Sequence, residues 1–421
     1  MASERLAGRW RSAIVRFDGS ASAGYPAAMS DALPDFDRLD LATLRRRRGE
    51  KWQLFGPDVL PAWVAEMDFP LAAPVQRVLA EAVEIGDVGY PLDVRPDALP
   101  AAFAERMEAR FGWRPDPRGV EVLTDVVQGI YVAIDQFSEP GEGVLVQTPV
   151  YAPFLVAVRE LRRRTIENPL VVGTARYEID FEQLRRAIDP GTRVFLLCNP
   201  QNPTGRVFER AELEALAEIA IAHDLVVVAD EIHGDLVYAG RRHIPFASLA
   251  PEVAARTITL TSATKAFNIP GLRCAVAHFG SDALKKRFNR VPRHIRGGLG
   301  SLGQAATLAA WREGQPWLDA VLGYLEGNRR SVARFVAERL PGVRHFEPEA
   351  TFLAWLDCRS LELTPSPQAF FLEHARVALS DGSVFGAPGR GFARLNFATS
   401  RPLLDEITTR IEKSLRERAA R

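Results

Sequence analysis

The chain has 421 residues, 47% of them hydrophobic, and its 53 lysines and arginines balance its 53 aspartates and glutamates. A chain of this size can bury a large core in two or three domains, and its neutral charge argues against binding to nucleic acid or to a bare membrane surface. No apolar run approaches the roughly 18 residues that a membrane helix needs, and no signal-peptide core opens the chain. The three cysteines are widely spaced, which predicts buried free thiols in a cytoplasmic protein.

The first stretch of the chain predicts little regular structure. Residues 1–30 are rich in alanine, serine, glycine and arginine, which predicts a flexible tail. The arginine run at 45–48 predicts the solvated face of a short helix, and we expect residues 31–65 to pack with the smaller of two domains. The segment 61–70, PAWVAEMDFP, combines large apolar residues with two acids just before a helix that Pro74 opens.

The next stretch predicts a strand, a turn and a helix that could bind an anion. Val120–Leu123 has the pattern of a short strand, and Thr124–Ile130 leads through a glycine into a helix that ends near Phe137. The free N–H groups and the dipole at such a helix start favour a phosphate. This signal is weak alone, because every α/β unit contains such a turn. A further strand, Val144–Val146, ends at the sequence TPVYAPF.

Three continuous apolar runs predict strands of a mostly parallel sheet that helices cover on both faces. The runs are Val144–Val146, Val194–Cys198 and Leu225–Ala229, and the β-branched strand Thr257–Leu260 follows them. Asn202, Asp230 and Lys265 follow the ends of the last three of these strands. Because ligands bind beyond the carboxyl ends of parallel strands, we expect the three side chains to meet at one edge of the sheet.

The pattern of elements predicts an α/β fold with a large domain at 66–310 and a smaller α+β domain at 311–421. A long helical pattern over 304–340 predicts one helix that links them. The smaller domain is expected to contain strands at 352–356 and 394–398 and helices at 367–376 and 402–418.

Lys265 lies between a β-branched strand and a Pro-Gly pair, among small and hydroxyl residues. Burial disfavours a charged ammonium, so a lysine here could be a free amine near neutral pH and attack a carbonyl; a solvated surface lysine is the alternative. A pyridoxal-phosphate site needs such a lysine, a carboxylate at the ring nitrogen, donors for the phenolic oxygen, a stacking aromatic ring, a phosphate site and an arginine for the substrate carboxylate. The sequence offers a candidate for each.

Seven motifs, taken in order, resemble those of a known family. They are WVAEMDF, GYP, TPVYAPF, NPQNPTG, DEIHGDL, SATKAFNIPGLR and FARLNFATSR. With them, the chain from Trp52 to Arg401 is similar to the fold-type I pyridoxal-phosphate enzymes, the class I/II aminotransferase superfamily, and most of all to its MalY/PatB group of cystathionine β-lyases (C-S lyases). The resemblance implies a pyridoxal 5′-phosphate cofactor and an amino-acid substrate.

The resemblance also implies a role for the three residues at the sheet edge. Lys265 would bind the cofactor aldehyde as an imine and act as base and acid at the substrate Cα. Asp230 would pair with the pyridine nitrogen, and Asn202 would donate to the phenolic oxygen. Without the resemblance, Asp230 could equally be a helix cap and Asn202 a turn asparagine.

Other residues would complete the site by the same resemblance. They are Tyr151 stacked on the ring, the backbone N–H groups of Gln128 and Gly129 with Ser262 and Arg273 at the phosphate, and His233 near the phenolic oxygen, where a buried core histidine is the alternative. Arg394 would grip the substrate carboxylate, with Asn202 and Tyr151 beside it. Tyr90 would reach the phosphate of the neighbouring subunit, which implies a homodimer with shared active sites. Glu66, Asp68 and His233 fall in two motifs that the resemblance already accounts for, so the sequence predicts no metal site.

Two reactions remain open on this constellation. The residues of the motifs DEIHGDL and TKAFNIPGL favour a β-lyase. Such an enzyme cleaves cystathionine or related cysteine S-conjugates to a thiol, pyruvate and ammonia by α,β-elimination. Arg273 lies eight residues after Lys265, the aminotransferase spacing, and keeps a class I/II aminotransferase as the alternative. A regulator on this fold is a third hypothesis, which the retained lysine disfavours. Glu66, where the group often has aspartate, leaves the substrate open.

Overall fold

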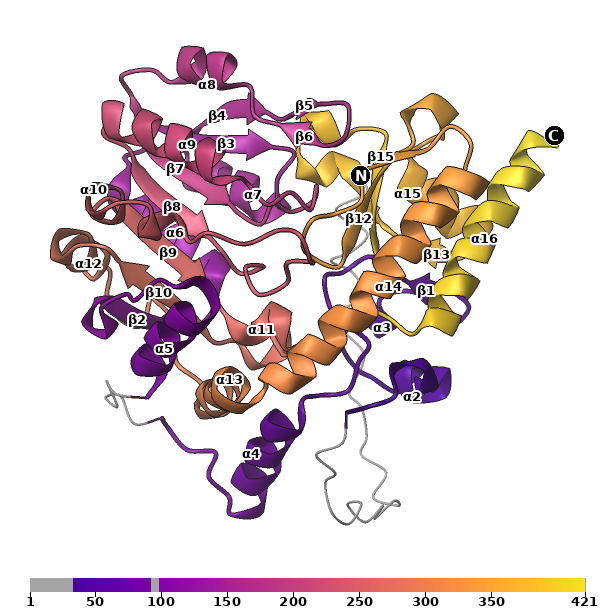
Figure 1. The fold of residues 1–421 in the computed structure, drawn as a ribbon, viewed down its shortest axis with the longest axis horizontal. Coiled ribbons are helices and arrows are strands. Elements are labelled where there is room, and N and C mark those ends of the chain that lie inside the picture. The colour runs from indigo at the N-terminus through magenta and orange to yellow at the C-terminus, as the bar shows by residue number, and fades with distance from the viewer. Residues whose placement is uncertain (1–32, 92–97, 421) are drawn as a thin grey trace. The chain divides into compact units, whose positions relative to one another are not determined.

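The central element of the fold is a seven-stranded sheet, seen in the computed structural model, which describes residues 33–91 and 98–420 (Figure 1). In spatial order the strands are β2 (Val120–Leu123), β10 (Ala275–Phe279), β9 (Thr257–Thr261), β8 (Val226–Asp230), β7 (Thr192–Cys198), β3 (Gly143–Thr148) and β4 (Arg164–Pro169). The strands from β9 to β4 run parallel, and β10 is antiparallel to β9 and to β2. The expected mostly parallel α/β sheet is therefore confirmed.

Helices cover both faces of this sheet. They are α6 (Val126–Phe137), α7 (Ala152–Glu160) and α12 (Asp282–Phe288) on one face, and α8 (Phe181–Ala187), α9 (Arg210–Ala222) and α10 (Pro251–Ala254) on the other. Successive side chains of a strand point to opposite faces. Val144 and Val146 of β3 accordingly pack with the first group of helices, and Leu145 packs with the second. This two-sided burial explains why the strands are continuous apolar runs.

Beside β2 and β10 lie three helices, one of which corrects an expectation. They are α4 (Ala73–Glu84), α5 (Leu99–Phe111) and α13 (Ser301–Glu313). The expected single helix over 304–340 is wrong, because α13 ends at Glu313 and α14 (Gln315–Arg339) begins anew. Pro316 has no N–H and so cannot donate the hydrogen bond that would continue α13. Gly314 lies at the junction of the two helices, where a Cβ would overlap the carbonyl oxygen of Ala310.

A second, antiparallel sheet lies toward the C-terminus (Figure 1). Its strands, in order, are β11 (Arg344–His345), β12 (Leu353–Asp357), β15 (Phe392–Asn396) and β14 (Ser380–Asp381), and its helices include α14, α15 (Pro367–Phe370) and α16 (Arg401–Ala419). The strands expected at 352–356 and 394–398 and the final helix are confirmed. The helix expected at 367–376 is α15 followed by a π-helical turn, Phe371–Ala375.

The N-terminal described residues run beside both sheets. They form α2 (Leu41–Arg45), α3 (Glu50–Gln53) and β1 (Leu60–Pro61). β1 pairs in parallel with β13 (Val377–Ala378). Elsewhere in the chain, β5 (Val171–Val172) and β6 (Tyr177–Glu178) make a separate antiparallel pair. The predicted tail at 1–30 lies outside the described residues. The arginine run is not simply solvated, because α2 ends at Arg45 and Arg47 donates to the carbonyl groups of Met67, Asp68 and Phe69.

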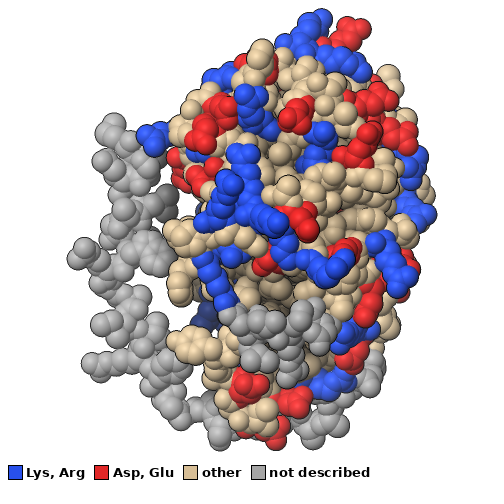
Figure 2. Space-filling model, turned by 90° about the vertical axis from the view of Figure 1, so that its left-hand side faces the viewer, with Lys and Arg blue, Asp and Glu red and all other residues tan. Residues whose placement is uncertain are grey.

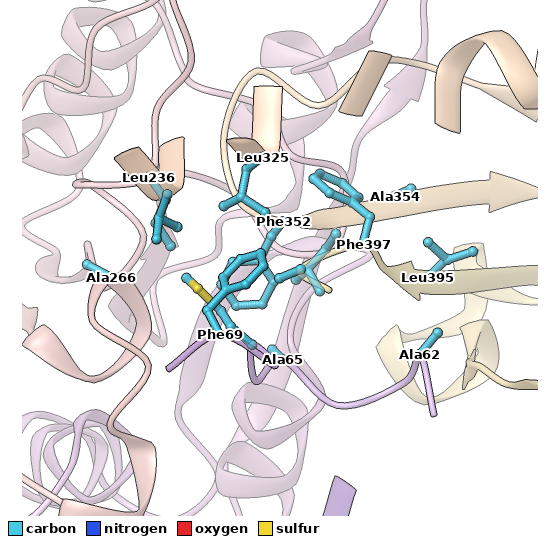
Figure 3. Packing of buried hydrophobic residues seen from close by; sticks show 14 of the residues in the cluster. Ala62, Ala65, Phe69, Leu236, Ala266, Leu325, Phe352, Ala354, Leu395 and Phe397 are labelled. Carbon is cyan, nitrogen blue, oxygen red and sulfur yellow. The ribbon is translucent and has the colours of Figure 1, made fainter. Parts of the chain in front are cut away.

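One apolar core joins residues 62–69 to elements of both sheets. Figure 3 shows Ala65 and Phe69 beside Phe352 and Phe397, with Leu236 and Ala266 on one side and Ala354 and Leu395 on the other. Phe69 and Phe352 are almost fully buried. This segment is therefore anchored by its side chains, although it forms neither helix nor strand.

Among residues 33–91 and 98–420, every helix is too short or too polar to span a membrane. The same residues bring together no group of three histidine, cysteine, aspartate or glutamate side chains that could hold a metal ion. The three cysteines, Cys198, Cys274 and Cys358, are buried and unpaired with one another.

Candidate active site

A cavity of about 660 Å³ lies beyond the carboxyl ends of β7, β8 and β9. Among the residues predicted from sequence, it is lined by Gln128, Tyr151, Asn202, Asp230, His233, Ser262, Lys265, Arg273 and Arg394. The three strands are neighbours in the sheet, with Cys198 beside Asp230 and Asp230 beside Leu260. Asn202, Asp230 and Lys265 therefore meet at one edge, as their positions after three parallel strands predict.

Lys265 is presented to the cavity by a one-turn helix, α11 (Ala263–Ala266), whose start Ser262 caps through its hydroxyl oxygen. The Lys265 Nζ donates to the carbonyl oxygen of Ala65 at 2.8 Å. Burial, with a smaller effect of the nearby Arg394 charge, lowers the pKa of Lys265 to about 8, against the opposing effect of Glu66 and Asp230. Roughly a tenth of the amine is therefore unprotonated and nucleophilic at pH 7, far more than for a lysine of ordinary pKa.

Asp230 and His233 both lie at the end of β8 and are both buried. Burial raises the pKa of Asp230 to about 7, although the backbone N–H of Ile232 donates to its Oδ1 at 3.1 Å. A cationic group brought against this carboxyl would favour its ionised form. Burial, then the charges of Lys265 and Arg394, lowers the pKa of His233 to about 3, so its imidazole is neutral at physiological pH.

Arg394 reaches the cavity from β15 of the second sheet. Its Nη1 donates to the Oδ1 of Asn202 at 2.9 Å, and its Nη2 donates to the carbonyl oxygen of Trp63 and the hydroxyl of Ser380, both at 3.1 Å. Burial lowers the pKa of Arg394 to about 10, so the guanidinium is still charged near neutral pH. The contact with Arg394 occupies the amide oxygen of Asn202 and leaves its N–H groups for a ligand.

The start of α6 changes one prediction about the anion site. The N–H of Gln128 donates to the Asp125 side chain, which caps the helix, and the N–H of Gly129 donates to the Asp125 carbonyl. Gly129 is not among the residues that line the cavity, and a Cβ there would overlap Leu123 and Leu260, so its glycine serves packing. The first N–H groups of a helix have no acceptor within it, and here these belong to Val126 and Val127, which line the cavity.

Ser262 and Arg273 also line the cavity, but other groups occupy their side chains. The Ser262 hydroxyl donates to the Cys274 carbonyl, and the Arg273 guanidinium pairs with the Asp125 carboxylate. Arg273 has a φ of 44°, a left-handed conformation that is uncommon for arginine. Strain of this kind persists where surrounding structure fixes it, often at functional sites. An anion at the start of α6 would find Arg273 within the same lining.

Tyr90 is fully exposed and does not line this cavity. It borders a separate hollow of about 900 Å³, whose lining includes Arg118, Lys285 and Arg296. Figure 2 looks onto the side of the chain where α12 lies and shows lysine and arginine side chains gathered across it. Tyr90 therefore cannot serve the phosphate site of its own chain in this arrangement.

Sequence reasoning missed several groups that contact the predicted ones. The carbonyl of Ala65 is unreadable from sequence, because any residue type supplies one. Asp125 lay within the singled-out turn, and its position before a helix was an available signal for a capping role. The motif WVAEMDF belongs to the family resemblance, yet nothing in it indicated that its backbone would contact Lys265 and Arg394.

A sequence model described as aminotransferase class I and II matches residues 71–411. The chain belongs to this family. Within the family, it is 36% identical to "Cystathionine beta-lyase PatB" from Bacillus subtilis (strain 168) over 388 residues, covering 90% of this chain and 100% of that protein.

Solved structures of family members share the fold. The crystal structure of OvoB is 39% identical, with a TM-score of 0.86, over 91% of this chain and 99% of that one. The PLP-bound C-S lyase from Staphylococcus hominis is 29% identical, with a TM-score of 0.85, again over 91% and 99%. Each likeness covers 91% of this chain, so the folds correspond over that part of it.

Proposed function

We propose that the chain is a pyridoxal-phosphate-dependent carbon–sulfur β-lyase, which cleaves cystathionine or related cysteine S-conjugates to a thiol, pyruvate and ammonia. The observation that carries the cofactor assignment is the partly buried Lys265 in one cavity with the buried Asp230 carboxyl and the buried Arg394 guanidinium. The choice of reaction is supported by the full-length similarity to a cystathionine β-lyase and to a C-S lyase structure.

The groups around the cavity fit pyridoxal phosphate. Lys265 would hold its aldehyde, Asp230 its pyridinium nitrogen and Asn202 its phenolic oxygen, with Tyr151 against the ring and His233 close by. The buried Asp230 carboxyl, whose pKa is raised to about 7, is the kind of group that a bound pyridinium cation would keep ionised. We place its phosphate at the start of α6.

The phosphate donors at the start of α6 depart from the sequence-based proposal. The N–H groups of Val126 and Val127 replace those of Gln128 and Gly129, because the latter two are bonded to Asp125. Ser262 and Arg273 remain candidate side-chain donors. An anion at the helix start would also gain from the helix dipole.

The chain's own residues account for the remaining steps. Bound pyridoxal phosphate supplies an electron-withdrawing ring that stabilises negative charge at the substrate Cα. Arg394 binds the α-carboxylate through its guanidinium, which orients the Cα–H bond. Lys265, as a free amine, accepts the Cα proton; the electron pair of that bond then forms the Cα=Cβ bond and the thiolate leaves from Cβ. Hydrolysis of the released enamine by water gives pyruvate and ammonia.

An aminotransferase is the second candidate, and two observations favour it. The matching family model carries that description, and Arg273 has the family's spacing from Lys265. Both reactions begin with removal of the Cα proton. In a lyase a thiolate then leaves from Cβ, whereas in an aminotransferase Lys265 would deliver the proton to the cofactor. Small differences in geometry around this amine decide between them. The need for a keto acid separates them in solution.

The deciding experiment supplies the holoenzyme with L-cystathionine and no keto acid. We expect pyruvate and a thiol to be released over many turnovers, measured by coupled reduction of pyruvate and by thiol titration. A reaction that stops after one turnover and resumes on addition of a keto acid would overturn the lyase assignment in favour of an aminotransferase. A panel of cysteine thioethers, run in the same way, identifies the preferred leaving thiol.

Replacing Arg394 by lysine is expected to lower kcat/KM by about 10²-fold, mostly through KM, because a charge-assisted contact with the carboxylate is worth roughly 1.5–3 kcal/mol. Lysine keeps the charge but lacks the planar fork. Steady-state kinetics on the preferred thioether measure the change. Arg359→Lys, a partly exposed arginine at the end of β12, is the matched control. An unchanged KM in the Arg394 variant would contradict its substrate role.

We further propose a homodimer in which Tyr90 reaches the phosphate site of the neighbouring subunit. The full exposure of Tyr90 and the partial exposure of the nearby apolar residues Val83, Ile85 and Val88 support this arrangement. Sedimentation is expected to give twice the chain mass, and a monomer with full activity would contradict the homodimer.

The unpaired cysteines support a cytoplasmic location. We also propose that the two sheets mark domains at 66–310 and 311–421, with 31–65 packed on the second.

A further inference from the structure

The segment Trp63–Phe69, here called the strap, touches both side chains that the proposed reaction uses most. The carbonyl oxygen of Ala65 accepts from Lys265 Nζ at 2.8 Å, and that of Trp63 accepts from Arg394 Nη2 at 3.1 Å. Both contacts are made by backbone atoms. The position of the strap therefore determines where these two side chains find their acceptors.

The strap has no helix or strand to hold it, so side chains from other elements bind its peptide groups. Asn396 donates to the carbonyls of Val64 and Glu66, and Asn268 bonds both the N–H and the carbonyl of Met67. Buried peptide groups need such partners. These contacts fix the strap residue by residue on both sides of Ala65.

The strongest anchor is a buried ion pair between Lys51 of α3 and Asp68 of the strap. Nζ and Oδ1 are 2.9 Å apart, and both side chains are only 1% exposed. The same Lys51 Nζ donates to the carbonyl of Glu66 at 2.9 Å, and the Trp52 indole N–H donates to the Asp68 Oδ1 at 2.8 Å. Lys51 thus binds the Glu66–Met67 peptide, the next one along the chain from the peptide that carries the Ala65 carbonyl.

Stability alone gives little reason for this pair. Burying two charges carries a large desolvation penalty, and well-packed apolar residues often replace a buried ion pair without loss of stability. An ammonium with fixed partners does something apolar residues cannot: it sets the orientation of the Glu66 carbonyl. That orientation constrains the adjoining Ala65 carbonyl, which faces Lys265.

We propose that Lys51 and Asp68 are positioning residues for the reaction: their ion pair holds the strap so that the Ala65 carbonyl orients the Lys265 amine and the Trp63 carbonyl orients Arg394. The proposal rests on the proposed function only in that Lys265 and Arg394 are the working groups. It holds for a lyase and for an aminotransferase, since both use the Lys265 amine at the substrate Cα.

The test uses the double variant Lys51→Met/Asp68→Leu, which leaves neither charge buried and unpaired. Arg163→Met is the matched control, because Arg163 is a buried arginine bonded to Ser138 and lies outside the cavity lining. Lys51→Arg, which keeps a cation and its donors, is the conservative rescue. Thermal melting of each variant shows that it is folded.

The first readout does not depend on turnover. The rate at which the cofactor-free chain takes up pyridoxal phosphate follows the unprotonated fraction of Lys265, and the wild-type midpoint is expected near the Lys265 pKa of about 8. An acceptor carbonyl favours the protonated amine. Loss of its alignment in the double variant is expected to lower the midpoint by at least about half a pH unit, while Arg163→Met leaves it unchanged.

The second readout is the kinetics of the loaded enzyme. Because small displacements of catalytic groups have large effects, kcat is expected to fall about tenfold or more in the double variant, with a rise in KM from the loosened Arg394. Lys51→Arg is expected to recover part of both. A folded double variant with wild-type midpoint, kcat and KM would overturn the proposal. If the double variant does not fold, Asp68→Asn replaces it, because asparagine keeps the side-chain volume and the acceptor for Trp52. The uptake midpoint and the kinetic constants of this variant then decide the proposal in the same way.

The two proposals fail in different ways. If the wild-type enzyme releases no pyruvate without a keto acid, the lyase assignment falls, but the uptake midpoint still tests the positioning role. If the lyase reaction is found and the midpoint and kinetic constants of the double variant match the wild type, only the positioning role falls.

Discussion

Replacing Lys265 by alanine is expected to lower kcat by about 10⁴-fold or more, because the same amine holds the cofactor and moves the Cα proton. The variant is also expected to lose the visible absorbance of the lysine-bound cofactor. Activity assays with the preferred thioether and absorbance spectra of the purified protein measure the two effects. Melting temperature should change little, since Lys265 makes a single hydrogen bond to the strap among the described residues.

The matched control for this variant is Lys413→Ala. Lys413 lies on α16, is largely exposed and pairs with Glu417. It should keep both the activity and the spectrum of the wild type. A Lys265→Ala protein that retained the lysine-bound absorbance would show that another lysine holds the cofactor. The assignment of Lys265 would then be lost, whatever the rate.

Replacing Asp230 by asparagine is expected to lower kcat by about 10²- to 10³-fold, the usual effect of removing one preorganised electrostatic partner. Asparagine keeps the shape of the side chain and its acceptor oxygen for the Ile232 N–H, so the end of β8 should remain intact. What it cannot do is balance the charge of a protonated pyridine ring. The ring nitrogen should then lose its proton, and the ring should withdraw electrons from Cα less strongly.

The pH dependence gives this variant a second test. The pKa of Asp230, raised to about 7 by burial, should fall once a pyridinium cation lies against it, so protonation of Asp230 should cause no separate loss of activity near pH 7 in the wild-type holoenzyme. Asp224→Asn, a change at an almost fully exposed carboxylate, is the control. A kcat for Asp230→Asn within a few-fold of the wild-type value would contradict the proposed role of Asp230 at the pyridine nitrogen.

Much of the large sheet could be predicted from sequence because its strands are buried on both faces. β7 and β8 contain continuous apolar runs and β9 is a buried β-branched strand, and Asn202, Asp230 and Lys265 follow their ends in one cavity. The motif order gave the family, which the family match confirmed. The break between α13 and α14 was missed because apolar spacing continues across Gly314.

The parts of the site that sequence did not predict depend on backbone atoms. The acceptor for Lys265 is a carbonyl 200 residues earlier in the chain, at Ala65, and a carbonyl leaves no trace in residue type. The proposal of Val126 and Val127 as phosphate donors has a similar origin. Which N–H groups remain available depends on the capping bond from Gln128 to Asp125, a detail of local geometry.

The hydrogen bond from Arg394 to Asn202 joins β15 of the second sheet to the loop after β7. On the proposed roles, one partner meets the substrate carboxylate and the other meets the cofactor's phenolic oxygen. Binding equilibria that share such a link are reciprocal: each ligand changes the affinity of the other by the same factor. A carboxylate that binds at Arg394 should therefore shift the pKa of the cofactor. The ionisation state of the cofactor should in turn change the affinity for the carboxylate, and the two coupling free energies should be equal.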